Sequence, residues 1–139
     1  PQSARMTIQF SIAVANAYLD QIETTIGTAP ILKILSGSMP ANCAAAETGT
    51  VLAQCTLPSD WLGAAASGVK SKSGTWEDTS ANATGTAGYY RIYDSSGTTC
   101  HQQGTVTATG GGGDMTVDST AFTATQPFTV NSFQWTGQI

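Results

Sequence analysis

The histidine and the cysteines are the residues best suited to metal binding. The chain has one histidine, His101, and three cysteines, Cys43, Cys55 and Cys100. A structural zinc site takes four Cys or His ligands and usually includes a close Cys-x-x-Cys pair, which this chain lacks. Cys100 and His101 are neighbours in an expected strand, so their side chains should point to opposite faces. We therefore expect no metal site.

Nucleophilic catalysis would need a serine or cysteine beside a base. A Ser-His-Asp triad is recognised by geometry, but the sequence has no nucleophile-elbow pattern that would suggest one. His101 stands in a polar stretch with Gln102 and Gln103, which favours a surface histidine. The glycine run 110–113 lacks the Lys-Ser/Thr and the helix start of a phosphate-binding loop. We expect a protein that is not an enzyme and takes no cofactor.

Several carboxylates stand near predicted turns or strand ends. They are Glu77, Asp78, Asp94, Asp114 and Asp118. Two facing carboxylates in an apolar cleft can hydrolyse a glycoside, and a calcium loop needs acids at alternating positions. Turn positions explain these residues more simply, because an aspartate side chain bonds to nearby backbone N–H groups in a turn. No residue is predicted to be catalytic.

Composition excludes several classes of partner. Charged residues make up only 10% of the 139 residues, the net charge is −4, and five Lys and Arg are not enough for a nucleic-acid surface. No stretch approaches the roughly 20 apolar residues of a membrane span. Three cysteines are too few for a disulfide scaffold, so we expect reduced thiols in a protein made in a reducing cytoplasm. The length favours a single domain over residues 1–139.

The first 26 residues predict an arm and a helix. Residues 1–10 alternate Met6, Ile8 and Phe10 with polar residues, which is typical of an extended arm that docks on its own body or on a neighbour. Residues 11–26 carry apolar side chains at helical spacing, with Ser11 as N-cap and Gly27 after the last turn. We expect the apolar stripe to pack on the domain's own sheet.

The chain beyond Gly27 predicts seven or eight short strands. A hairpin at 89–106 has the clearest pattern, because Asp94 begins and Gly97 ends a short turn. Short strands without helices between them cannot form a parallel sheet through crossover units. We therefore expect a mainly β fold, an antiparallel β-sandwich or jelly roll over residues 31–135. Other strands are expected at 31–35, 50–57, around 69–76, 115–118 and 128–135.

Aromatic residues leave a further alternative open. In the strand at 89–93, Tyr90 and Ile92 should share one face, and Tyr89, Arg91 and Tyr93 the other. We expect one of these faces to be core, so at most one offers a platform on which sugars stack. Packing in the core or at an interface is the favoured use of these rings.

The segment from Thr79 to Thr98, TSANATGTAGYYRIYDSSGT, resembles a segment of small virion structural proteins of tailed bacteriophages. Further matching motifs follow in the same order, and others precede it. They are Ser36 to Pro40, Thr48 to Ala53, Gly104 to Val106, Gly113 to Val117 and Val130 to Phe133. These are turn and strand signatures without chemistry. The sequence departs from the resemblance at Cys100 to Gln103 and in its four-glycine loop.

The resemblance implies a β-sandwich component of a virion, assembled in the host cytoplasm. We expect a capsid decoration (cement) protein on the capsid surface that binds the major capsid protein and forms a homo-oligomer, a dimer or trimer. The alternatives are a tail or fibre subunit and a glycan-binding module. The expected contact residues are Met6, Ile8 and Phe10 of the arm, together with Trp61 and Leu62 in an exposed loop.

Overall fold

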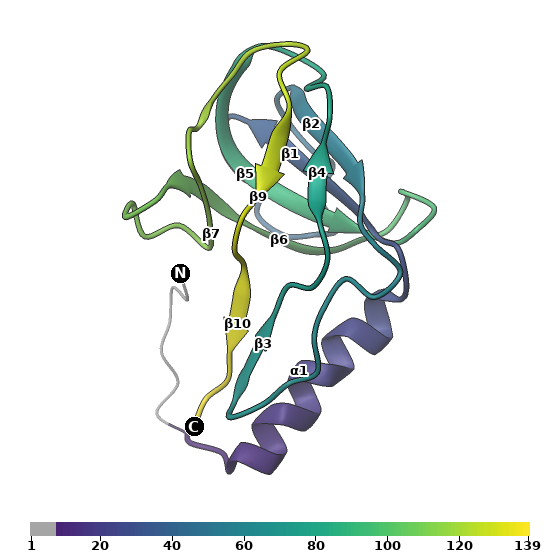
Figure 1. Cartoon of the computed structure of the whole chain (residues 1–139), viewed down its shortest axis with the longest axis vertical. Helices are drawn as coiled ribbons and strands as arrows, with labels where there is room; N and C mark the ends of the chain where they lie inside the picture. Colours follow the sequence, from purple (N-terminus) through teal and green to yellow (C-terminus); the bar gives the residue numbers. More distant parts are fainter. Residues whose placement is uncertain (1–7) are drawn as a thin grey trace.

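The computed structural model describes residues 8–139 and shows a mainly β chain with one helix (Figure 1). The elements in chain order are α1 (Ile12–Ile26), β1 (Ile31–Ser36), β2 (Val51–Thr56), β3 (Val69–Ser71), β4 (Trp76–Asp78), β5 (Gly85–Tyr93), β6 (Cys100–Ala108), β7 (Met115–Val117), β8 (Ala121–Phe122), β9 (Phe128–Val130) and β10 (Gln134–Thr136).

Helix α1 confirms the expected helix and both of its ends. The Ser11 hydroxyl accepts a hydrogen bond from the Val14 N–H at 3.2 Å, which satisfies one of the unpaired donors of the first turn. Gly27 follows with φ +93°, a conformation that glycine adopts without strain, and its N–H donates to the Glu23 carbonyl. The middle of the apolar stripe is buried at Ala15 and Leu19.

The largest sheet has the strand order β2-β1-β5-β6-β7, with β8 paired to the start of β5. Its first three pairings are antiparallel, and the β5–β6 hairpin confirms the predicted one. Asp94 and Gly97 close the hairpin turn as expected, since the Gly97 N–H donates to the Asp94 carbonyl at 2.9 Å. The expectation of purely antiparallel pairing was wrong at β7, which runs parallel to β6.

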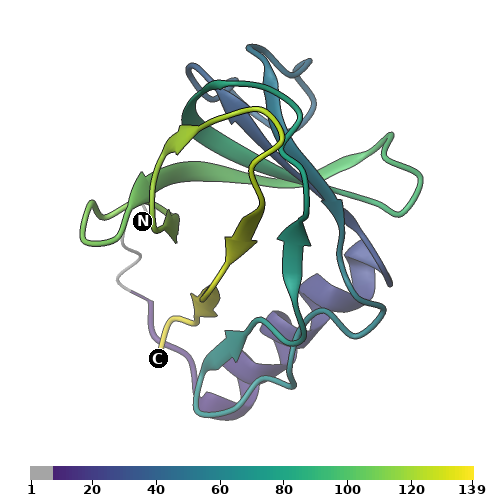
Figure 2. The same cartoon turned by 45° about the horizontal axis from the view of Figure 1, so that its top comes forward.

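Two strand pairs complete the β structure. The pairs β3–β10 and β4–β9 are both antiparallel and separate from the large sheet, and none of the sheets closes on itself. In both views β4 and β9 lie over the large sheet, while α1 lies beside β3 (Figures 1 and 2). The predicted strand at 128–135 is divided into β9 and β10, because the chain leaves strand geometry at residues 131–133.

The core lies between these parts and is rich in aromatic side chains. Trp61 packs against Trp76 and Trp135, with ring centroids 5.9 Å and 6.0 Å apart. Phe133 joins this group through Trp76 and through Tyr90 on the large sheet. One continuous cluster of buried residues therefore connects the sheet with the two strand pairs.

The prediction that Trp61 and Leu62 are exposed was wrong. Their side chains are fully buried, although they lie between strands. The indole N–H of Trp61 donates to the Gly27 carbonyl at 2.9 Å, so this loop folds inward against the end of α1. Burial of these two apolar side chains removes them from any contact surface.

The prediction that only one face of the strand at 89–93 is core also needs correction. Tyr90 and Ile92 belong to the main core, and Tyr89, Arg91 and Tyr93 on the opposite face are buried as well. The connection between β1 and β2, residues 37–50, lies over that second face, and we call it the covering loop. This strand therefore offers no open aromatic platform.

Candidate functional site

Two of the predicted arm residues lie at the N-terminal end of α1. The Phe10 N–H donates to the Gln138 carbonyl at 2.7 Å, and the Phe10 ring meets Tyr18 edge to face with centroids 5.7 Å apart. Ile8 lies two residues earlier and is exposed. Met6 lies outside the described residues. The described part of the arm thus contacts the chain's own C-terminal segment.

Several apolar side chains at this end of the molecule are exposed. We call this group the apolar end surface; its members are 37–57% exposed, and they are Ile8, Phe10, Ile12, Val14 and Ile139. Figure 1 shows the start of α1 and the C-terminal residues at the same end of the molecule. Ile8 and Phe10 were predicted contact residues, whereas Ile12 and Val14 were not, because they lie in the segment predicted to form the helix. Five exposed apolar side chains at one end of a small chain fit a protein-binding surface.

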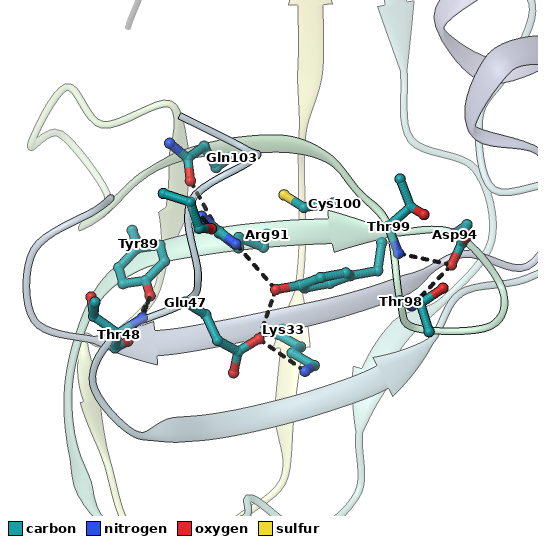
Figure 3. Close-up of polar contacts among 12 residues, drawn as sticks. Lys33, Glu47, Thr48, Tyr89, Arg91, Asp94, Thr98, Thr99, Cys100 and Gln103 are labelled. Atoms are coloured by element: carbon teal, nitrogen blue, oxygen red, sulfur yellow. Dashed lines mark hydrogen bonds and ion pairs between the residues drawn. The ribbon is translucent and has the colours of Figure 1, made fainter. Parts of the chain in front are cut away.

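A partly buried polar cluster lies between the large sheet and the covering loop (Figure 3). We define it as Glu47 of the loop together with Lys33, Arg91, Tyr93 and Gln103 of the sheet. Tyr93 donates its hydroxyl hydrogen to Glu47 at 2.7 Å, and Lys33 forms an ion pair with the same carboxylate oxygen at 3.0 Å. The Arg91 Nε donates to Gln103 at 3.0 Å, and its Nη1 donates to the Tyr93 hydroxyl at 3.3 Å.

Arg91 also holds the covering loop. Its Nη2 donates to the carbonyls of Asn42 at 3.1 Å and Ala45 at 2.9 Å, and Tyr89 exchanges hydrogen bonds with the backbone of Thr48. The guanidinium has five fixed donors, and here they bridge a strand and a loop. The polar cluster therefore fastens the covering loop onto β5.

The shifted pKa values of Glu47 and Tyr93 make the polar cluster unsuited to proton transfer at neutral pH. Burial alone would raise the pKa of Glu47, but hydrogen bonds from Tyr93 and Lys33 outweigh burial and hold the pKa below its usual value. Burial and the hydrogen bond to Glu47 raise the pKa of Tyr93 to about 12. Neither group changes charge near pH 7, where a general acid or base works best. The cluster fits a structural role.

The other residues considered for chemistry do not form a common site among the described residues. His101 is exposed, as expected, and borders a shallow hollow against α1 that is otherwise lined by helix residues. The Asp94 carboxylate accepts from the N–H groups of Thr98 and Thr99, which confirms its turn role. Within residues 8–139, no three His, Cys, Asp or Glu side chains gather closely enough to hold a metal.

A hollow beside β10 was not predicted from the sequence. Among the described residues it has a volume of about 660 Å³, and its apolar lining includes Tyr90, Phe133 and Trp135. Two buried polar atoms in this lining, Gln102 Oε1 and the Trp135 indole N–H, have no hydrogen-bond partner. Leaving such atoms unpaired costs free energy, but both are sealed from solvent and therefore do not face the open space of the hollow. No sequence signal marks the hollow, because its residues come from five separate segments.

Comparisons of the chain with protein families, with curated proteins and with solved structures found no match. No helix among residues 8–139 combines the length and the apolar character that crossing a membrane requires. What the protein does must be argued from its own residues.

Proposed function

We propose that this protein is a non-enzymatic virion structural protein, a capsid decoration protein that binds the major capsid protein lattice at the capsid surface as a homo-oligomer. The apolar end surface is the observation that carries the proposal. Five apolar side chains at one end of a small chain are unfavourable in water, and their burial against another protein would stabilise a complex.

Low charge supports the same function. Only 10% of the residues are charged, so a large interface would bury few ions, whose desolvation is costly. A subunit that touches several neighbours on a lattice needs no single strong contact, because linked contacts reinforce one another. The sequence resemblance to tailed-phage virion proteins points to the capsid as that lattice.

The finer architecture belongs to this proposal. We regard the large sheet as one layer, and the pairs β3–β10 and β4–β9 as the second layer, of a sandwich-like body. Two-layer β bodies of this general kind, jelly rolls above all, occur in viral capsid proteins. In this arrangement the apolar end surface is the end that contacts the capsid.

Binding to capsids tests the proposal. Particles assembled without this protein are mixed with the full chain, and bound copies are counted after sedimentation. The double variant Ile12→Asp, Val14→Asp should bind at least about tenfold more weakly, since two charges would be buried at the contact. Aspartate suits the first turn of a helix, so the variant should still fold. Met39→Asp, which changes an exposed apolar residue of the covering loop, is the control.

Equal binding by both variants would reject the apolar end surface as the contact. Deletion of residues 1–10 examines the arm separately, and it should also weaken binding. A truncated chain that saturates capsids with unchanged affinity would remove the arm from the mechanism. Light scattering of the free protein measures whether it is a dimer or trimer.

The second candidate is a glycan-binding module on a tail or fibre. The observation that favours it is the hollow beside β10, whose lining includes the aromatic residues Tyr90, Phe133 and Trp135, on which a sugar ring can stack. Titration with host polysaccharides should then change tryptophan fluorescence. A flat response across a broad glycan panel excludes this candidate.

A further inference from the structure

The covering loop brings one cysteine over the start of β6. Cys43 lies between Asn42 and Ala45, whose carbonyls both accept hydrogen bonds from Arg91 on β5. The Pro40 carbonyl accepts a hydrogen bond from Gln103 on β6 at 2.8 Å. Three hydrogen bonds on both sides of Cys43 therefore fix its position above the β5–β6 hairpin.

The second cysteine, Cys100, is the first residue of β6 and pairs with Tyr93 in the hairpin register. Figure 3 shows its side chain near Arg91. The pairing with Tyr93 places Cys100 on the sheet face that the covering loop lies over, and Cys43 is near enough to raise the pKa of the Cys100 thiol; both residues are half-buried. The fold thus places together two thiols that are 57 positions apart in the chain.

We propose that Cys43 and Cys100 form an intramolecular disulfide when the protein meets a disulfide oxidant such as oxidised glutathione. One protein thiolate attacks a sulfur of oxidised glutathione and releases one glutathione thiolate, which takes up a proton. The other protein thiolate then attacks the protein sulfur of the mixed disulfide and releases the second glutathione. Two protein thiols are oxidised, and one glutathione disulfide is reduced to two thiols.

The third cysteine provides an internal control. Cys55 lies on β2 in the main core, and burial raises the pKa of its thiol to about 12. Burial and the neighbouring Cys43 also raise the pKa of Cys100 to about 12, so the reaction should be slow at pH 7 and faster at pH 8.5. The covering loop would be locked onto the hairpin, and the bond would restrict the unfolded chain over a long segment. This inference does not depend on the proposed capsid role.

Thiol counting on the full chain tests it. The protein is incubated with oxidised glutathione at pH 8.5 and then denatured, and free thiols are measured. The count should fall from three to one, the oxidised form should unfold at a temperature several degrees higher, and peptide mapping should find residues 43 and 100 linked. Cys43→Ser and Cys100→Ser should each lose the linkage and the stabilisation.

Three results would overturn the proposal: three free thiols after oxidation, a stable glutathione adduct without the internal link, or a disulfide that involves Cys55 or a second chain. Peptide mapping of the unsubstituted chain distinguishes these results from the expected linkage even if a serine variant fails to fold.

Discussion

The Lys70 ammonium lies 2.6 Å from Asp20 Oδ1 and is almost completely buried, with 1% of its surface exposed. It also pairs with Glu23 at 2.8 Å and donates to the Gly63 carbonyl at 2.9 Å. Asp20 accepts a further hydrogen bond from the Ala65 N–H. This one buried cation joins α1, β3 and the loop between β2 and β3, the region that supports the apolar end surface.

Replacing Lys70 should therefore lower the free energy of unfolding of the protein. Lys70→Met keeps the length of the side chain but removes the charge, so Asp20 and Glu23 lose their buried partner. We expect a loss of about 2 kcal/mol in the free energy of unfolding, less than for a fully buried pair because Asp20 is half-exposed. Urea denaturation measures it. Lys72→Met, which removes a cation that donates to the nearby Gly74 carbonyl, should cost under about 1 kcal/mol. Equal losses in the two variants would contradict this account.

The same pair predicts a loss of stability in acid. The hydrogen bond from Lys70, together with that from the Ala65 N–H, holds the pKa of Asp20 below its usual value. A carboxyl with a depressed folded pKa contributes stability that is present above its unfolded pKa, about 3.9, and is lost as pH falls through the folded value. Stability should thus decline below about pH 4, and Asp20→Asn should flatten this part of the profile. An unchanged slope in Asp20→Asn would show that other carboxyls control acid unfolding.

Close packing of β5 against the covering loop predicts an intolerant glycine. A methyl group at Gly88 would lie 2.0 Å from the Gly37 carbonyl oxygen, so the backbone of one segment would have to move. Gly88→Ala should lower the free energy of unfolding by at least about 2 kcal/mol. At Gly63 the nearest atom would be 3.7 Å away, so Gly63→Ala should be nearly neutral. Thermal unfolding of both variants makes the comparison, and a stable Gly88→Ala protein would refute the close contact.

Arg91 should be irreplaceable by another cation. A lysine at this position would keep the charge, but a single ammonium cannot reach Gln103, Tyr93 and two loop carbonyls at once. Arg91→Lys should therefore raise the rate of amide hydrogen exchange in the peptide covering residues 40–49 by at least about tenfold. A tenfold faster exchange means that the free energy of local opening is about 1.4 kcal/mol lower than in the parent protein. Exchange in α1 should stay unchanged. Equal acceleration in both regions would indicate general destabilisation instead of loop release.

Local sequence patterns correctly predicted the helix ends and the hairpin turn. Ser11 and Gly27 marked the helix ends, and Asp94 with Gly97 marked the hairpin turn, because caps and turns are formed by residues close in sequence. Burial of Trp61 and Lys70 could not be predicted in this way, since each is buried by segments far along the chain. The covering loop is rich in small residues and carries no pattern that predicts burial, yet it covers a whole strand face through its contacts with Arg91 and Tyr89.

The two indoles that meet in the core predict unequal costs for the same substitution. Trp61 donates to the Gly27 carbonyl at the end of α1, whereas the Trp135 N–H has no partner although it is buried. Trp61→Phe should cost about 2 kcal/mol, because it leaves that carbonyl without its donor and removes ring volume. Trp135→Phe also removes volume but relieves an unpaired donor, so its cost should stay under about 1 kcal/mol. Urea denaturation followed by far-UV circular dichroism compares them without relying on tryptophan emission. A larger loss for Trp135→Phe than for Trp61→Phe would mean that the Trp135 N–H is hydrogen-bonded in solution.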